Sequence, residues 1–260
     1  MTKKIPNIDK IYFINMDKSI DRLKNVQNQC KAADIECSRF PAVNGYNVLI
    51  ENSIGKSFFG IDLMNTKTQL PENQKFKITC DPKSRDITTY NIIGDSSVSA
   101  GQLGGWCSVI EIMKNAKRNN YKNILIFEDD IKIENPTNFA NKVSNILSHT
   151  PKNFDFLFLG LSVNKGFLSP LKSNTLISSA SNNFMGYGLH SYVVSNKGIE
   201  KFLSYDAYDF TAKDVFIWNH ASTSDIQAAE NSFECYASSE NLVYQNYDFQ
   251  SLLTEMGRTY

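Results

Sequence analysis

The residues best suited to chemistry are three adjacent carboxylates, Glu128, Asp129 and Asp130, which directly follow the apolar run 123–127. This pattern predicts a buried strand whose end carries three like charges. Because such charges repel one another and are costly to leave unneutralised beside a core, a cation or a set of basic side chains is expected there. Hard divalent cations prefer carboxylate oxygens, so a metal that carries a phosphorylated substrate is the sharpest hypothesis. A solvated acidic turn, paired with a neighbouring lysine such as Lys132, is the alternative.

A second group of polar residues follows the apolar, β-rich run 11–16. In α/β proteins the turn after such a strand lies at the carboxyl edge of the sheet, where ligands bind. Asn15 and Asp17 can hydrogen-bond a base or a ribose there. Arg22 lies near a predicted helix start, where its charge is unfavourable beside the helix dipole, so it can pair with a phosphate instead.

Alternating strands and helices must position these groups. Helical periodicity follows Ser19 and again follows Gly104, and each helix precedes an apolar strand. The pattern predicts an α/β fold with a mostly parallel, twisted sheet flanked by helices, in a single domain over residues 1–260. The alternation is lost over residues 47–98, which indicates an insertion with a hairpin that pairs 77–80 with 87–90. The polar stretch 163–183 is expected to be a mobile loop near the site.

Composition excludes several classes of protein. The 260 residues include 27 basic and 27 acidic side chains, so no global field attracts nucleic acid or an anionic membrane. No apolar run is long enough to span a bilayer, and the N-terminus lacks a signal-peptide core. The five cysteines are scattered without a Cys-x-x-Cys pair, which favours reduced thiols in a cytoplasmic protein.

Several segments, in order, resemble glycosyltransferase family 25, which includes lipooligosaccharide β-galactosyltransferases and procollagen galactosyltransferases. The resemblance rests on the opening strand with Arg22, the run from Arg39 to Gly45, the small-residue helix start at 99–108, and the strand that ends in Asp130. Weaker similarity extends through 187–203 and 213–216. It covers most of the chain outside 47–98 and implies a nucleotide-diphospho-sugar transferase fold of the GT-A type.

The resemblance also implies an activity. A metal-dependent, inverting enzyme of lipopolysaccharide or other glycan biosynthesis would move a hexose, galactose by family precedent, from a UDP-sugar to a hydroxyl of a glycan, glycolipid or protein. With Mn²⁺ or Mg²⁺ as cofactor, Asp130 would ligate the metal, Asp129 would contact the ribose or reach the metal through water, and Glu128 would shape the donor pocket. Asp214 matches a family aspartate and is the candidate general base, with Asp225 behind it. Capping of a helix is the other explanation for Asp214.

The remaining candidates carry weaker signals. His220 is a possible third metal ligand, and Tyr187, beside two glycines, could face the sugar. His190 is more typical of a structural, hydrogen-bonded histidine. Both Trp106 and Trp218 sit in apolar helical patterns, which favour core packing over stacking on a sugar.

Three departures from the family pattern support a different hypothesis. Where the family has Glu, Cys and His, this chain has Gln102, Gly105 and Val109, so an imidazole and a carboxylate are lost. A catalytically inactive carbohydrate-binding or assembly protein on the same fold is therefore the alternative. A metal-dependent phosphohydrolase ranks third, because no further cluster of His and Asp is evident.

Overall fold

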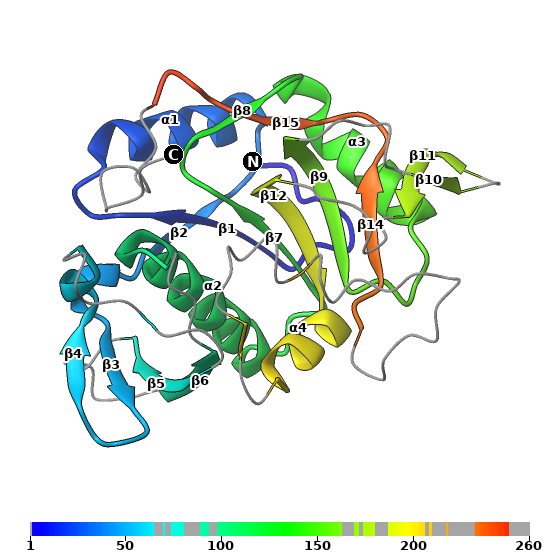
Figure 1. The fold of residues 1–260 in the computed structure, drawn as a ribbon. Helices are drawn as coiled ribbons and strands as arrows, with labels where there is room; N and C mark the ends of the chain where they lie inside the picture. Colours follow the sequence, from blue (N-terminus) through cyan, green and yellow to red (C-terminus); the bar gives the residue numbers. More distant parts are fainter. Residues whose placement is uncertain are drawn as a thin grey trace.

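The computed structural model describes residues 2–64, 70, 74–80, 89–93, 98–162, 169–171, 174–179, 187–205, 208–209, 217 and 232–249. Its largest sheet has eight strands in the spatial order β10-β11-β14-β9-β12-β7-β1-β2 (Figure 1). In chain order these strands are β1 (Lys10–Asn15), β2 (Ser38–Pro41), β7 (Asn123–Phe127), β9 (Phe156–Ser162), β10 (Ser169–Leu171), β11 (Asn174–Ser179), β12 (Tyr187–Ser195) and β14 (Cys235–Ser238).

Most strands of this sheet run in the same direction. β1 lies between β2 and β7 and is parallel to both, and β9 is parallel to β14. Among the described strands of this sheet, only β11 and β12 run in the opposite direction to the others. The prediction of an α/β fold with a mostly parallel sheet is therefore confirmed. Because β1 and β7 are parallel, their last residues, Asn15 and Phe127, lie at the same edge of the sheet.

Helices cover both faces of the sheet, as predicted. α1 (Ile20–Ala32) and α3 (Pro136–His149) pack on one face, and α2 (Ala100–Arg118) and α4 (Asn196–Leu203) pack on the other (Figure 1). Val26 of α1 and Phe139 of α3 belong to the first core, where Phe139 lies against Phe127 of the sheet. Trp106 is buried in the second core and stacks on Phe202, with ring centroids 6.0 Å apart. The expectation that Trp106 packs in the core is thus confirmed.

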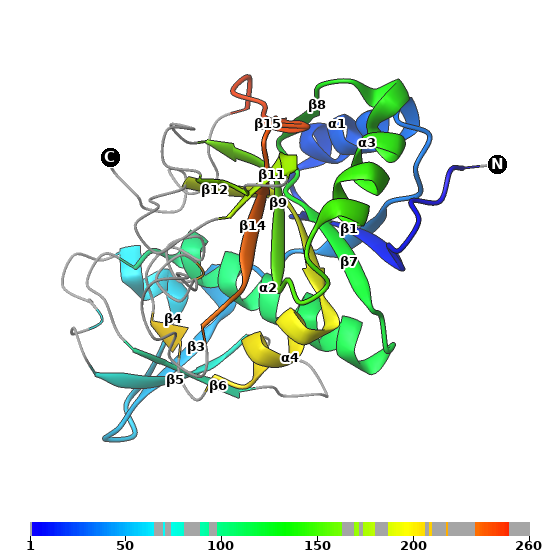
Figure 2. The ribbon, with the colours of Figure 1, turned by 90° about the vertical axis from the view of Figure 1, so that its right-hand side faces the viewer.

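A second, five-stranded sheet lies on the far side of α2 from α1 and α3 (Figure 2). It contains β3 (Leu49–Asn52), β4 (Ser57–Phe59), β5 (Lys75–Thr79), β6 (Thr89–Ile93) and β13 (Tyr208–Asp209). β5 and β6 pair antiparallel with Ile78 opposite Tyr90, which confirms the strand pairing expected within residues 47–98. Short 3-10 helices at Gly45–Asn47 and Gly60–Met64 lead into and out of the first hairpin of this sheet.

Two of the family-like segments, the one that ends at Gly45 and the one that begins α2, pack directly against each other. A Cβ atom placed on Gly45 would lie 1.6 Å from the carbonyl oxygen of Ala100, so only glycine fits there. Two turns along α2, the Ser108 hydroxyl accepts a 2.8 Å hydrogen bond from the Val43 N–H and donates to the Gly104 carbonyl. These residues therefore fix how the segment after β2 packs against the helix that precedes β7.

The cysteines correct one prediction. Cys30 is bonded to Cys37, which ties α1 to the start of β2, and Cys80 is bonded to Cys107, which ties β5 to α2. Cys235 is buried and free. The expectation of reduced thiols is wrong for four of the five cysteines, because the fold brings together pairs that are 7 and 27 residues apart in sequence. The cysteines therefore no longer support a cytoplasmic location, which stays a prediction.

None of the helices in the described part of the chain is long and apolar enough to cross a bilayer.

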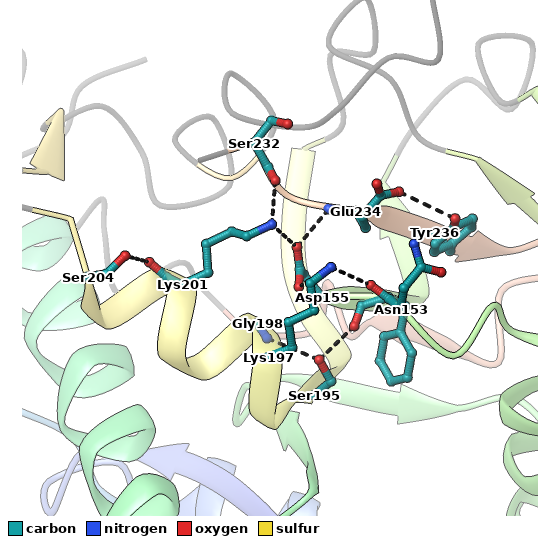
Figure 3. Close-up of polar contacts among 11 residues, drawn as sticks. Asn153, Asp155, Ser195, Lys197, Gly198, Lys201, Ser204, Ser232, Glu234 and Tyr236 are labelled. Carbon is teal, nitrogen blue, oxygen red and sulfur yellow. Dashed lines mark hydrogen bonds and ion pairs between the residues drawn. The ribbon is translucent and has the colours of Figure 1, made fainter. Parts of the chain in front are cut away.

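A cluster of charged side chains around the buried Asp155 (Figure 3) lies at the edge of the sheet opposite the acidic triplet. Asp155, fully buried just before β9, accepts a 2.7 Å hydrogen bond from Lys201 of α4 and a 2.9 Å bond from the Glu234 N–H. Lys197 lies 3.6 Å from the same carboxylate. These contacts join α4, β9 and the start of β14, and among the described residues Asp155 Oδ1 makes only the longer ion pair with Lys197.

Candidate functional site

Side chains from β1, α1 and the acidic triplet converge at the carboxyl edge of the large sheet. The Asn15 amide, at the end of β1, donates to Asp129 Oδ2 at 2.8 Å and to the Ser19 carbonyl at 3.1 Å. Arg22, from the first turn of α1, donates to Asp129 Oδ1 at 2.7 Å. The structure brings Asn15, Arg22 and Asp129 into contact at this edge, and their predicted contacts with the donor stay predictions. Both oxygens of Asp129 therefore accept hydrogen bonds from the protein.

Asp130 is held differently from its neighbour. Its Oδ2 atom accepts weaker hydrogen bonds from Arg22 at 3.2 Å and from Gln245 at 3.3 Å. Its Oδ1 atom is buried and has no hydrogen-bond partner among the described residues. The side chain is only 8% exposed, so one carboxylate oxygen is kept from bulk water without a protein donor. A buried acceptor of this kind is costly unless a ligand satisfies it.

The electrostatics follow from burial and crowding. Burial raises the pKa of Asp130 to about 6, with further upward contributions from Glu128 and Asp129 that outweigh the opposing effects of Arg22 and Gln245. Burial also raises the pKa of Asp129, although Arg22 and Asn15 act in the opposite direction. The pKa of Arg22 is lowered by burial but raised more by the two aspartates. A single guanidinium thus leaves Asp130 short of positive charge.

A second arginine extends the network to Asp17. Arg39, on β2, donates through Nε to the Asn15 side-chain oxygen at 3.0 Å and also pairs with Asp17. The Asn15 side chain therefore has protein partners on its oxygen and on both amide hydrogens. In this structure Asn15 and Asp17 act as structural links, and their predicted contacts with a base or ribose remain predictions.

Glu128 and His190 lie side by side across the β7–β12 boundary. The Glu128 N–H donates to the His190 carbonyl at 3.0 Å. His190 is buried, and its Nε2 lies 3.2 Å from the Val243 carbonyl, so Nε2 carries the proton in that contact. Burial lowers the pKa of His190, although Glu128 acts against this. His190 thus makes a structural hydrogen bond through Nε2, whereas its buried Nδ1 has no hydrogen-bond partner among the described residues.

The other predicted site residues fall outside the part of the chain that can be tested. The backbone of Tyr187 begins β12, but its side chain lies outside the described residues. Asp214, Asp225, His220 and Trp218 also lie outside them, as does most of the 163–183 segment. Their proposed roles stay predictions.

A divalent cation at this edge would meet one buried oxygen of the triplet that has no hydrogen-bond partner among the described residues, Asp130 Oδ1. The described residues contain no group of three His, Cys, Asp or Glu side chains arranged to hold a metal ion. Mg²⁺ sites on phosphorylated substrates commonly use one or two carboxylates and complete their shell with phosphate oxygens and water. Asp130 Oδ1 supplies such a ligand, whereas Asp129 would have to share oxygens already bonded to Arg22 and Asn15.

Three residues of this network were not found by sequence reasoning. Arg39 carried a signal, because it belongs to the family-like segment after α1 and lies beside Phe13 in the β1–β2 register. Gln245 and Phe249 carried none. They follow the acidic triplet by more than a hundred residues in sequence. They lie near it because the chain pairs with β8 (Ile131–Ile133), the strand directly after the triplet.

Comparisons with known proteins identify the family of this chain. The model of glycosyltransferase family 25, described as LPS biosynthesis protein, matches residues 8–217. The chain belongs to glycosyltransferase family 25. Among solved structures it is similar to a glycosyltransferase involved in the glycosylation of the major capsid of PBCV-1, with 8% identity, a TM-score of 0.31, and coverage of 83% of this chain and 68% of that one. No curated protein matches the sequence.

The substituted family positions have structural roles in this glycosyltransferase. The Gln102 side chain accepts a 2.8 Å hydrogen bond from the Ser99 N–H, and Ser99 Oγ accepts from the Gln102 N–H. This capping box satisfies the N-terminus of α2, and an amide serves it as well as a carboxylate does. Val109 is buried in the core around α2. The replacements at 102 and 109 are thus accommodated by helix capping and packing.

Proposed function

We propose that this family 25 enzyme is a metal-dependent, inverting glycosyltransferase that moves a hexose, galactose by family precedent, from a UDP-sugar to a hydroxyl of a glycan, glycolipid or protein. The observation that carries the proposal is the unsatisfied, buried Oδ1 of Asp130 at the carboxyl edge of the sheet. Its carboxylate has a raised pKa, so it gains from a nearby cation. Bound there, Mn²⁺ or Mg²⁺ would offset the negative charge of a departing nucleoside diphosphate.

Neighbouring residues orient the Asp130 carboxylate. Arg22 and Asn15 hold Asp129 through both of its oxygens, and this fixes the backbone that carries Asp130. Arg22 also bonds to Asp130 Oδ2, so the side chain is oriented with Oδ1 unbonded. A ribose hydroxyl can still donate to a second lone pair of Asp129, which keeps its proposed contact with the donor compatible with the network.

In the proposed reaction the acceptor hydroxyl oxygen forms a bond to the anomeric carbon of the sugar. The bond from that carbon to the diphosphate breaks on the opposite face, and the diphosphate leaves with the electron pair. The hydroxyl proton passes to a carboxylate, for which Asp214 is the proposed base. His220 is proposed as a further metal ligand, and Tyr187 as a contact of the sugar.

A donor screen tests the function. Purified protein with Mn²⁺ should be stabilised by UDP and by one UDP-hexose in thermal unfolding, and UDP-galactose should release UDP over time. Asp130→Ala should abolish both effects. Asp21→Ala is the matched control, because Asp21 is a carboxylate on the exposed surface of α1 and its side chain is 88% exposed. Full activity in Asp130→Ala would refute the site, and nucleotide-sugar binding without turnover across a broad acceptor panel would favour the inactive alternative.

A further inference from the structure

The last described segment of the chain closes over the acidic triplet. We call residues 243–249 the C-terminal strap. It begins as β15 (Val243–Gln245), which pairs antiparallel with β8 directly after the triplet, so that Gln245 lies opposite Ile131 (Figure 1). The family match ends at residue 217, so the strap lies beyond the part of the chain that the family model describes.

Three contacts join the strap to the site. The Gln245 side-chain amide donates to Asp130 Oδ2 at 3.3 Å, and the Asn246 N–H donates to the Asp130 carbonyl at 2.5 Å. The ring of Phe249 lies 5.6 Å from the guanidinium carbon of Arg22, within the range of a cation–π contact. The strap thus contacts the side chain of Asp130, its backbone, and the arginine that neutralises it.

The strap is itself anchored to the large sheet. The Val243 carbonyl accepts the hydrogen bond from His190, and the backbone there approaches β9 at Gly160. A Cβ atom on Gly160 would lie 1.9 Å from the Val243 oxygen, so the approach requires glycine. Because the anchor is made by backbone and by a buried side chain, the position of Gln245 is fixed by the fold.

We propose that the C-terminal strap is part of the donor site and that Gln245 is a positioning residue, which holds Asp130 Oδ2 so that Oδ1 is presented to the cation. Gln245 and Arg22 both donate to Oδ2, and Oδ1 has no hydrogen-bond partner among the described residues. This inference rests on the proposed function, because it assigns a role toward the same cation. Outer partners that orient a metal-binding carboxylate typically change metal affinity or activity by about 10–100-fold.

The test is Gln245→Met, which keeps the length of the side chain and removes its donor. Tyr244→Met is the matched control: this neighbour on β15 is 40% exposed, and strand alternation points it away from Asp130. Mn²⁺ binding is measured directly by calorimetry in the presence of UDP, together with the melting temperature and, for turnover of UDP-galactose, kcat and KM. We expect Gln245→Met to bind Mn²⁺ about 10–100-fold more weakly with little change in melting temperature, and Tyr244→Met to match wild type.

The outcomes separate the two proposals. If wild type binds Mn²⁺ and turns over the donor while Gln245→Met binds Mn²⁺ within twofold of wild type, the positioning role is overturned and the proposed function stands. If wild type binds no Mn²⁺, both are overturned. Phe249→Leu gives a second variant that leaves the Gln245 amide in place and removes the aromatic contact to Arg22. It should weaken Mn²⁺ binding less than Gln245→Met, and an equal or larger loss would overturn the assignment to Gln245.

Discussion

Replacing Asp130 by asparagine should make the metal-free protein more stable at neutral pH. In the folded state, burial and the charge of Glu128 raise the pKa of Asp130 from 3.8 to about 6, so the folded protein binds this proton more tightly than the unfolded chain does. The stabilisation from the protonated side chain is complete below about pH 4 and is lost as the pH rises through about 6. Asp130→Asn cannot ionise and does not suffer this loss.

The magnitude follows from the size of the shift. A difference of about two pKa units corresponds to about 3 kcal/mol at about 1.4 kcal/mol per unit, and the side chain is too buried for solvent screening to remove most of it. We therefore expect the free energy of unfolding of Asp130→Asn to exceed that of wild type by up to about 3 kcal/mol above pH 7, and to equal it near pH 4. Saturating Mn²⁺ should then stabilise wild type, by about 2.7 kcal/mol at one hundred times its Kd, and leave the variant unchanged.

The assay is urea unfolding in EDTA at intervals between pH 4 and pH 8, repeated at pH 7.5 with Mn²⁺. Asp21→Asn is the control, because its side chain is 88% exposed, and its difference from wild type should not vary with pH. A variant at Asp130 that is less stable than wild type at pH 7.5, or whose difference does not change with pH, would refute the argument that this carboxylate is buried with too little positive charge.

Two further predictions concern Arg22 and the cysteines. Arg22→Met leaves Asp129 buried without its cation and should lower the free energy of unfolding, measured in urea, by about 3–5 kcal/mol. Lys24→Met, on the exposed side of the same helix, is the control and should change it by no more than about 0.5 kcal/mol. A loss below about 1 kcal/mol for Arg22→Met would contradict the ion pair. Thiol titration of the unfolded, unreduced protein should find one thiol, and five thiols would show that neither disulfide forms. Cys80→Ser removes the disulfide to Cys107, which closes a 27-residue loop, and should lower the free energy of unfolding by about 3–4 kcal/mol.

Much of the fold was predictable because its signals are local. Apolar periodicity predicted the helices and strands around the triplet, and α2 ends at Arg118, just before Asn120 adopts a left-handed backbone. Ser195 caps α4 by accepting a hydrogen bond from the Gly198 N–H. Ser19 occupies the N-cap of α1 without making a side-chain capping bond; instead its carbonyl accepts from Asn15, which serves the site.

The rest could not be predicted because it depends on contacts between distant residues. That β12 runs against β7 and β9 is a matter of topology, which a single apolar strand does not encode. The partners of Asp130 show the same limit: Arg22 precedes it by 108 residues and Gln245 follows it by 115, and neither spacing is a pattern. The disulfides were missed for the same reason, since scattered cysteines reveal their pairing only in the folded chain.

The central claim is that Asp130 Oδ1 holds the cation that binds the donor diphosphate. Anomalous diffraction from crystals of the protein grown with Mn²⁺ and UDP tests it most directly. The claim predicts a manganese peak at a coordination distance of about 2.0–2.2 Å from Asp130 Oδ1, with a diphosphate oxygen also bound to the metal. UDP bound at this edge with its phosphates on Arg22 and no metal on Asp130, or manganese located away from Asp130, would contradict it.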